Sequence, residues 1–531
     1  MFNSKRKKKE AILSDYSKIK KGAFYFNSIS QYFVKIDHKD VFQVISDKTY
    51  QDLDLDEVFM YIDRTSSRVG QQFLYNAFRT IPSDNKRSQR FENLITRLNE
   101  SELLKETVIF SLARLQNQDA YYIASLFQEK HLEKPKWFWV VPLLSAGSIF
   151  SILLSFVIPQ FILLLLLFLV VNFIIHYWNR FKFNQYSGAV LQLIILKDVA
   201  RKIMKWPILL DDVGDMKRAI KTIQNIGFQL SVFKLEAKLQ SEIGQMIEFL
   251  IDIVKAIFLI EPLLFYNVLK KFESKRKEIH EIYQLIGELD VALSIDALRK
   301  DLPYYALPGI VNEANQLKSK ELYHPLLPNA VANSINNEGK SILLSGSNMS
   351  GKTTFIRTIG INAIVSQTIN TCFAKELSLP RLKIFSAIRI SDDIMNSKSY
   401  YFEEMLTIKE MLAESRSGNQ NLFLLDEMFK GTNTIERIAA GKSVLSYLSE
   451  EKNIVFISTH DLELAAYLKG SFHLYHFSEV IQDQEINFDY KIKPGQLKTT
   501  NAIKILELNQ YPTSIITEAK KLSDDLRKNK E

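Results

Sequence analysis

The most distinctive pattern in the chain is an apolar stretch, Trp137–Asn179, that contains no Asp, Glu, Lys or Arg. A helix that crosses a bilayer needs about 20 apolar residues, so this stretch is long enough for two passes. Pro159 and Gln160 stand near its middle, where a tight turn between two helices would fall. Trp137 and Trp178 mark its ends and basic residues flank it, which favours a hairpin with both flanks in the cytoplasm.

The stretch therefore predicts two transmembrane helices and a membrane-anchored protein. The alternative is a buried helical hairpin inside a large soluble core. Such a pair would normally show polar faces, whereas Phe161–Val171 is apolar all round. We expect the remainder of the chain to lie on the cytoplasmic side.

A second apolar region, Phe249–Leu269, differs because it carries charges. Asp252, Lys255 and Glu261 make its insertion into a membrane costly. We interpret it as a long amphipathic or buried helix within a largely helical stretch, roughly 185–300, in which apolar residues recur at helical spacing.

From about residue 340 the pattern changes. Short apolar runs, Ser341–Leu344, Asn421–Leu425 and Ile454–Ile457, alternate with helical segments and turns that contain glycine. This alternation is typical of a mostly parallel α/β sheet. The sequence thus predicts a helical part followed by an α/β part.

The composition restricts the class of protein but does not assign a function. A chain of 531 residues is expected to form two to four folding units, and its 47% hydrophobic and 24% charged residues are ordinary for a globular protein. The net charge of +8 is compatible with phosphate-rich partners or anionic lipid. Cys372 is the single cysteine, so no intrachain disulfide forms and a reducing compartment is expected. Lys5–Lys9 is basic, but no apolar run follows it, so it is a poor secretory signal.

The segment Gly346–Thr353 fits the phosphate-binding pattern G-x-x-x-x-G-K-[ST]. An apolar strand, Ser341–Leu344, precedes it, and an apolar helix, Thr354–Val365, follows it, as the pattern requires. Gly346 and Gly351 let the backbone curl so that several N–H groups face phosphate oxygens. The start of the helix adds a partial positive charge.

The side chains of this loop fit ATP and Mg²⁺ as cofactors. Lys352 is expected to reach the β- and γ-phosphates, and the Thr353 hydroxyl is expected to ligate Mg²⁺. The predicted nucleotide-binding residues are Gly346, Ser347, Asn348, Met349, Ser350, Gly351, Lys352, Thr353 and Thr354.

Leu422–Glu427 is an apolar strand that ends in two acids. We expect Asp426 to hold the Mg²⁺, usually through water, and Glu427 to polarise the attacking water. Two acids at a strand end otherwise form a solvated turn, and the upstream phosphate loop argues against that interpretation.

A third strand, Ile454–Ile457, is followed by His460. A lone histidine is usually structural, but this position fits the histidine that senses the γ-phosphate in ABC-type ATPases. The predicted catalytic residues of a Mg²⁺-dependent ATPase are therefore Lys352, Glu427 and His460, with Thr353 and Asp426 at the metal.

The motifs resemble those of the MutS family. GSNMSGKTT at the phosphate loop resembles that family's GPNMGGKST, and Asp426–Asn433 resembles its DEIGRGTST segment. Ser399–Met405 resembles the STFMVEM segment, which stands where ABC ATPases have their signature loop. The resemblance implies that Ser399 acts on the nucleotide of a partner subunit, and hence that the chain forms a homodimer.

The resemblance extends more weakly over most of the chain. Leu55–Pro82 looks like the start of the family's helical core, Glu288–Ser294 like the end of its lever helices, and His324–Leu326 like the segment leading into the ATPase. The implied architecture is α + α/β: a helical core and lever domain with an inserted transmembrane hairpin, then an ABC-type P-loop ATPase domain. The expected boundaries are 1–48 for a basic N-terminal segment, 49–136 for the start of the core, 137–179 for the hairpin, 180–318 for the core and levers, 319–490 for the ATPase and 491–531 for a helical dimerisation segment.

Three departures from the family pattern affect the expected role. Core-like sequence begins near residue 50, which leaves no room for a mismatch-reading N-terminal domain. No clamp domain is recognisable between the lever halves. Ala330–Asn333 stands where many relatives place an aromatic residue against adenine. The resemblance thus implies a MutS-like, ATP-dependent DNA-binding protein related to mismatch repair that does not itself read mismatches.

Three functions remain open on this sequence. The leading one is a membrane-anchored, dimeric ATPase that uses ATP binding to move its helical levers, with DNA as an open partner. The second is a DNA-binding module in which nucleotide only gates a clamp. The third is an ATPase acting on a non-DNA partner or an ABC-transporter-like machine, for which two spans per chain form a small pathway.

Overall fold

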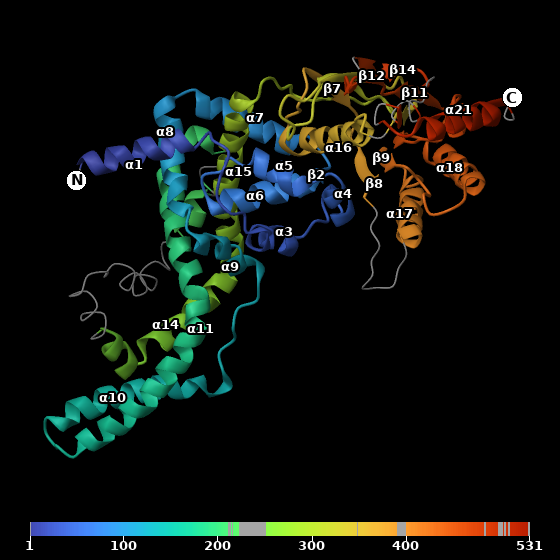
Figure 1. Ribbon diagram of the computed structural model, residues 1–531. Coiled ribbons are helices and arrows are strands. Elements are labelled where there is room, and N and C mark those ends of the chain that lie inside the picture. The colour runs from blue at the N-terminus through green and yellow to red at the C-terminus, as the bar shows by residue number, and fades with distance from the viewer. Residues whose placement is uncertain are drawn as a thin grey trace. The chain divides into compact units, whose positions relative to one another are not determined.

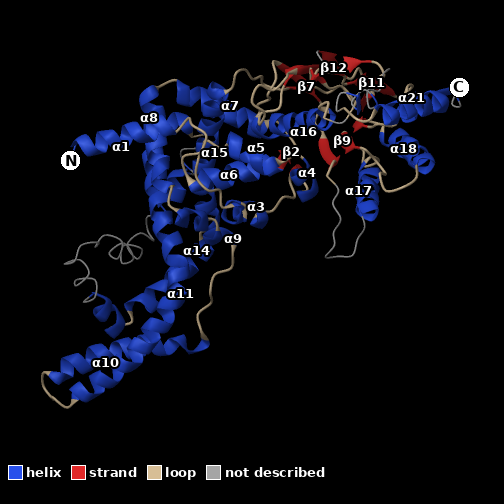
Figure 2. Cartoon of the chain, in the orientation of Figure 1, coloured by secondary structure: helices blue, strands red, loops and turns tan. Residues whose placement is uncertain are grey.

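The computed structural model of the chain describes residues 2–210, 214, 216–221, 223, 251–347, 349–389, 400–482, 485–497, 503, 506, 507 and 510–528. It forms two compact units (Figure 1). The first comprises Met1–His38, Asp63–Ala77 and Gln89–Lys300, and the second comprises Lys39–Ile62, Phe78–Ser88 and Asp301–Glu531. The fold is mixed, helical in the first unit and α/β in the second, as the sequence predicts (Figure 2).

The first unit is helical throughout its described part. Its α-helices are α1 (Phe2–Asp15), α2 (Phe26–Ile29), α3 (Gln31–Lys35), α6 (Arg68–Arg79, whose last two residues belong to the second unit), α7 (Lys86–Asn99), α8 (Glu102–Leu112), α9 (Ser125–Gln128), α10 (Val140–Ser155), α11 (Phe161–Ile203), α14 (Ile260–Ser274) and α15 (Arg276–Asp301). Short 3₁₀ turns are η1 (Ala113–Leu115), η2 (Gln118–Ile123), η3 (Lys136–Trp139) and η4 (Pro207–Leu209). α15 is the central helix, since nearly every residue from Ile279 to Arg299 is buried or half-buried.

α10 and α11 form the predicted helical hairpin. They pack closely, because a Cβ added at Gly147 would lie 2.8 Å from the ring of Phe168. Asn172 donates a 2.8 Å hydrogen bond to the hydroxyl of Ser148 across the pair. The second helix does not end with the hairpin: α11 continues for 43 residues, and its later part, around Leu193 and Leu196, is buried in the helical core.

The hairpin is mostly uncovered in this chain. Lys136–Ser155 and Phe161–Asn179 are long and apolar enough to cross a membrane by length and composition, and only 22% and 11% of these stretches are buried. Phe156 at the tip is 85% exposed and Leu163 is 73% exposed. This exposure contradicts the alternative of a hairpin buried in a soluble core. Membrane crossing itself stays a prediction.

The predicted long helix over Phe249–Leu269 is broken, and its first two residues lie outside the described part of the chain. Residues 251–257 are helical, Leu259 adopts a left-handed φ of 49°, and α14 follows. Ser145 donates to the carbonyl of Phe258 and Asn172 to that of Ile257, so hairpin side chains satisfy backbone groups that the break frees. Nearby, buried Lys255 lies 3.2 Å from buried Glu261. The predicted buried character is observed, and the prediction of one continuous helix is wrong.

The second unit is built on a six-stranded sheet of order β14-β11-β6-β10-β9-β8, parallel except for β14. A four-stranded sheet has the order β3-β7-β4-β5, and β1-β2 and β12-β13 form two-stranded pairs. The strands are β1 (Val41–Val44), β2 (Thr80–Pro82), β3 (Gly309–Ile310), β4 (Lys318–Leu322), β5 (Asn333–Asn336), β6 (Ser341–Ser345), β7 (Glu376–Leu379), β8 (Lys383–Ala387), β9 (Asn421–Asp426), β10 (Asn453–Ser458), β11 (Phe472–His476), β12 (Glu479–Gln482), β13 (Glu485–Phe488) and β14 (Lys493–Pro494). The helices are α4 (Asp47–Asp52), α5 (Leu55–Ile62), α16 (Lys352–Ile369), α17 (Tyr400–Glu414), α18 (Thr434–Leu448), α19 (Leu462–Leu468) and α21 (Thr513–Lys528).

Residues 39–62 belong to this second unit, although the sequence places them in a basic segment and the helical core. The amide of Gln43 bonds both backbone groups of Ile384 on edge strand β8, at 2.8 and 2.7 Å. Buried Asp52 accepts hydrogen bonds from the hydroxyl of Ser386 and the N–H of Ile388 just after β8. These side-chain contacts to an edge strand leave no periodic signal in the sequence.

Candidate nucleotide site

The phosphate loop lies between β6 and α16. All five residues of β6 are buried, and the helix begins at Lys352, directly after the loop. Gly346 and Gly351 adopt φ values of 149° and 103°, which side chains rarely tolerate. A Cβ at Gly346 would also lie 2.8 Å from the carbonyl oxygen of Phe477. Both glycines are thus required by the backbone of the loop itself.

Lys352 is folded back over this loop. Its Nζ donates 2.8 Å hydrogen bonds to the carbonyl oxygens of Gly346 and Ser347. Burial lowers the pKa of this ammonium, while the carboxylates of Glu427 and Asp426 oppose that shift. The ammonium therefore lies at the loop, where phosphate oxygens can replace carbonyl oxygens as its acceptors.

Thr353 and Asp426 are brought together as the sequence predicts. The Thr353 hydroxyl donates to one oxygen of Asp426 at 2.7 Å, and the Ser458 hydroxyl donates to the other. Ser458 and Asp426 are paired residues at the ends of adjacent strands β10 and β9, so the sheet register sets this contact. One hydroxyl and one carboxylate suit Mg²⁺, which keeps several waters and takes its remaining ligands from phosphates. A cage of three or more His, Cys, Asp or Glu is not found among the described residues.

Glu427 lies between two basic side chains, those of His460 and Lys430. Its carboxylate is 2.9 Å from Nε2 of His460 and 2.8 Å from Nζ of Lys430. The hydrogen bond from His460 is the largest cause that lowers the pKa of Glu427 to about 2. Nε2 of His460 also lies 3.5 Å from Nζ of Lys352. The three predicted catalytic residues thus converge, and Glu427 is ionised at neutral pH and able to orient a water.

Two predicted residues, Asn348 and Ser399, lie outside the described residues. Met349 is 83% exposed, and Ser347 donates a 2.7 Å hydrogen bond to Glu479. The buried hydroxyl of Ser350 has no hydrogen-bond partner within the described structure. These loop positions are consistent with a ligand-facing loop rather than a packed turn.

A cavity of about 500 Å³ opens beside the loop and takes in Thr353, Thr354 and Glu427. Its lining also includes four apolar or aromatic residues, Pro328, Val331, Phe477 and Tyr490. The volume is within the ordinary range for small-molecule sites. The lining therefore combines residues of the phosphate loop with apolar residues.

Tyr490 is the principal residue that the sequence did not reveal. Asn333 fixes its backbone, donating to the carbonyl of Tyr490 and accepting from the N–H of Ile492, at 3.0 and 2.9 Å. The ring approaches the phosphate loop, since its Cδ1 would lie 3.2 Å from a Cβ at Gly351. Ala330–Asn333 contains no aromatic residue, and the aromatic ring in the cavity lining comes instead from Tyr490, far along the chain.

Other supporting residues were also missed. Glu404 accepts a 2.7 Å hydrogen bond from the N–H of Phe429, and Arg437 forms a two-pronged ion pair with Asp461. These contacts brace the chain after the Asp426–Glu427 pair and after His460. The cavity wall includes His324, whose pKa is lowered to about 4, chiefly by burial.

Comparison with known proteins gives a consistent result. Residues 342–527 match the family model for MutS domain V. The chain is 30% identical over 282 residues to the DNA mismatch repair protein MutS of Halalkalibacterium halodurans, 29% over 253 residues to that of Aquifex pyrophilus, and 29% over 283 residues to that of Listeria welshimeri. The matches cover 50%, 46% and 50% of this chain but only 32%, 29% and 32% of those relatives.

Proposed function

The chain belongs to the MutS family, and from that premise we propose that it is a Mg²⁺-dependent ATPase. One observation carries the proposal. Three segments far apart in the sequence, the phosphate loop, the end of β9 and the residues after β10, bring Lys352, Thr353, Asp426, Glu427 and His460 to one site.

Each side chain has a defined task in this proposal. The N-terminus of α16 and Lys352 bind the phosphates, and Thr353 with Asp426 would hold Mg²⁺. The metal supplies neutralisation of the negative charge that develops on the transferred phosphoryl group. Glu427, kept ionised by His460 and Lys430, orients the attacking water. His460 holds Glu427 in place and lies close enough to Lys352 to contact the γ-phosphate region.

The apolar end of the cavity supports binding of the adenine. Pro328 and Val331 line the cavity, and the ring of Tyr490 lies close to Gly351 of the phosphate loop. Aromatic rings bind flat heterocycles by offset stacking. We assign Tyr490 to the base side of the nucleotide.

We further propose that the working form is a homodimer that binds DNA in an ATP-dependent manner, in a process related to mismatch repair. The names of the matched relatives support this proposal, as does the resemblance of Ser399–Met405 to a segment that completes a partner's site. An ATPase acting on a non-DNA partner is the alternative, and DNA stimulation separates the two.

Residues 137–179 are proposed to anchor the protein in a membrane, with the nucleotide site in the cytoplasm. The exposed apolar side chains of the hairpin support this, because large uncovered apolar surfaces mark contact with a partner or a membrane. Two helices per chain suit an anchor better than a transport pathway.

The decisive experiment measures ATP hydrolysis by the purified full chain, alone and with duplex, mismatched or branched DNA. Lys352→Ala should abolish hydrolysis, and Glu427→Gln should bind ATP without turning it over. Rapid turnover by Glu427→Gln would refute the role given to that residue. Absence of any DNA binding at low salt would favour the non-DNA alternative.

A further inference from the structure

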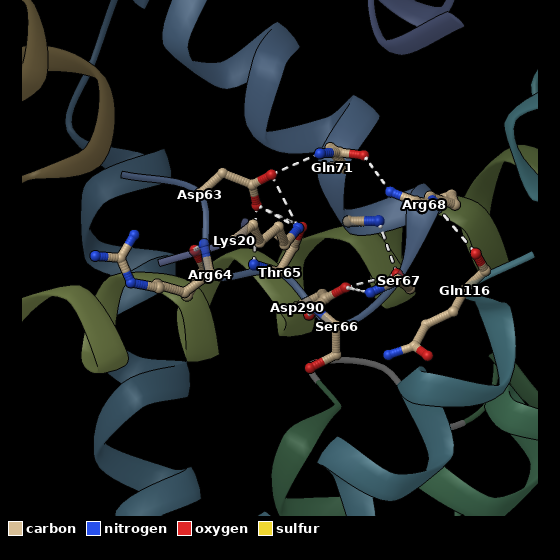
Figure 3. A network of polar contacts seen from close by, with 12 residues as sticks. Lys20, Asp63, Arg64, Thr65, Ser66, Ser67, Arg68, Gln71, Gln116 and Asp290 are labelled. Atoms are coloured by element: carbon tan, nitrogen blue, oxygen red, sulfur yellow. Dashed lines mark hydrogen bonds and ion pairs between the residues drawn. The ribbon is translucent and has the colours of Figure 1, made fainter. Parts of the chain in front are cut away.

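A second cavity, of about 710 Å³, lies within the helical unit and is separate from the nucleotide site. One wall is the end of α1 and the segment after it, residues 11–24. The other wall is the turn before α6 and its first turn, residues 64–71, with Gln116 at the side. Figure 3 shows the polar contacts that hold this second wall in place.

The walls of this cavity are strongly basic. Five cationic side chains line the cavity: Lys18, Lys20, Lys21, Arg64 and Arg68. None of the described lining residues is acidic. Like charges gathered around one hollow repel one another and create a positive potential inside it. Such an arrangement suits an anion.

Two acids near the cavity, Asp63 and Asp290, accept hydrogen bonds from neighbouring groups (Figure 3). Asp63 accepts hydrogen bonds from Lys20, from the backbone and hydroxyl of Thr65 and from Gln71. Asp290, on α15, accepts from the N–H groups of Ser66 and Ser67. Asp290 therefore takes the amides that precede α6, and the cavity's positive potential comes from side chains rather than from the start of that helix.

The contacts of two of these side chains, Lys20 and Arg68, are seen directly. Lys20 lies 2.8 Å from Asp63, whereas Arg68 donates to two neutral oxygens, the carbonyl of Gln116 and the side chain of Gln71. The guanidinium of Arg68 is thus fixed in position by contacts that leave its charge in place. A fixed guanidinium is well suited to bind phosphate.

The remaining lining limits the class of anion. Phe24, Ile12 and Ile19 give the cavity an apolar side, and its volume is that of a drug-sized ligand. We propose that this cavity binds a soluble, nucleotide-sized phosphate ester, with its phosphate on Lys21 and Arg68 and its apolar part against Phe24 and Ile19. Arg64–Ser67 form part of one wall and lie in the segment between α5 and α6, so such a ligand would act from outside the ATPase site.

The surroundings favour a soluble ligand over a lipid headgroup. The hairpin, residues 137–179, contributes no residue to the cavity, and α1 packs on α8. In Figure 1, α1 and α10 lie at opposite ends of the helical unit. A headgroup in a membrane entered by the hairpin would not reach this cavity.

The test is calorimetric titration of the detergent-solubilised full chain with ADP, with inorganic pyrophosphate and with water-soluble dihexanoyl phosphatidylinositol 4-phosphate. We expect two binding components for ADP, one lost in Lys352→Ala and one retained. The retained component should weaken by about tenfold in Lys21→Glu and in Arg68→Gln. Lys130→Glu, an exposed change in the same unit outside the cavity, should leave it unchanged.

Each outcome decides the proposal. Absence of ADP binding by Lys352→Ala, or a retained component unaffected by Lys21→Glu and Arg68→Gln, would overturn it. Tighter binding of the lipid analogue than of ADP at the retained component would replace the nucleotide class with a lipid headgroup. Lys21 is exposed, so its variant should fold even if Arg68→Gln does not. Because the second component is measured in Lys352→Ala, failure of the ATPase proposal would leave this test intact.

Discussion

The hydroxyl of Thr353 donates a 2.7 Å hydrogen bond to Asp426, although 73 residues separate the two in the sequence. The contact joins the first turn of α16 to the end of β9. It places a neutral and an anionic oxygen ligand side by side, which is the pair that Mg²⁺ bound to a nucleotide needs.

Asp426→Asn should raise the Mg²⁺ concentration that supports half-maximal hydrolysis by about tenfold or more, because the metal loses an anionic ligand. Nucleotide binding without Mg²⁺ should persist, since Lys352 and the loop are unchanged. Magnesium titrations of ATPase rate and of ADP affinity measure both effects. Thr353→Ser keeps the hydroxyl and should stay near wild type, and an unchanged magnesium requirement in Asp426→Asn would contradict the metal assignment.

The pH profile of hydrolysis should depend on His460. In the wild type, the pKa of Glu427 is about 2, so this carboxylate stays ionised through the working range. His460→Ala removes the largest cause of that shift, so the pKa should rise towards its ordinary value near 4.5. Protonation of Glu427 then begins at higher pH.

The raised pKa of Glu427 in His460→Ala should change how both activity and stability depend on pH. The residual single-turnover rate of His460→Ala should fall on acidification at a higher pH than that of the wild type. A lowered carboxyl pKa stabilises the fold above pH 4.5 and is lost as pH falls towards 2, so the variant should also lose this contribution. Lys430→Ala is the milder control, since Lys430 is half exposed. Superimposable acid limbs in the wild type and His460→Ala would refute the coupling.

Tyr490→Ala should raise the KM for ATP by about tenfold with little change in kcat, because a stacking contact binds ground state and transition state alike. Tyr490→Phe retains the ring and should behave as the wild type. Steady-state kinetics give both constants. A wild-type KM in Tyr490→Ala would remove this residue from the base site.

Asp52→Ala should destabilise the second unit by about 3 kcal/mol or more, because it leaves buried donors without an acceptor. These are the hydroxyl of Ser386 and the N–H groups of Ile388 and Arg389. Lys48→Ala removes the partly exposed ion pair with Asp52 and an exposed hydrogen bond to the carbonyl of Arg389, and it should cost about 1 kcal/mol or less. Denaturant unfolding compares the two, and equal effects would show that the backbone contacts of Asp52 carry little energy.

Deletion of residues 137–179 should move the protein from the membrane fraction to the soluble fraction. The full chain should resist extraction by carbonate and dissolve in detergent. Leu163→Lys combined with Leu167→Lys places two charges on exposed positions of α11 and should weaken insertion by about 5 kcal/mol. Recovery of the intact chain as a soluble protein without detergent would refute the anchor.

Short sequence patterns predicted much of this structure. Strands β6, β9 and β10 and the phosphate loop follow from short apolar runs and a glycine pattern, and these strands are neighbours in the sheet. The approach of Glu427 and His460 follows from their places after parallel strands that end at one edge of the sheet.

What the sequence did not predict depends on contacts between distant segments. Tyr490 reaches the cavity only because Asn333 fixes the backbone at that point. The break at Leu259 is accommodated by Ser145 and Asn172, which come from the hairpin. Periodicity cannot reveal such contacts, because each partner is ordinary within its own segment.

α11 connects the hairpin directly to the helical core. Its 43 residues run without a loop from the exposed hairpin into the buried helical core. The thickness of a bilayer influences the tilt of a helix that spans it. Under the proposed anchoring, a thicker or thinner membrane would reorient the first part of α11, and the same continuous backbone would carry that reorientation to the core packed around Leu193. The packing of the helical unit would then depend on the chain length of the surrounding lipids, although no lipid is bound at a specific site.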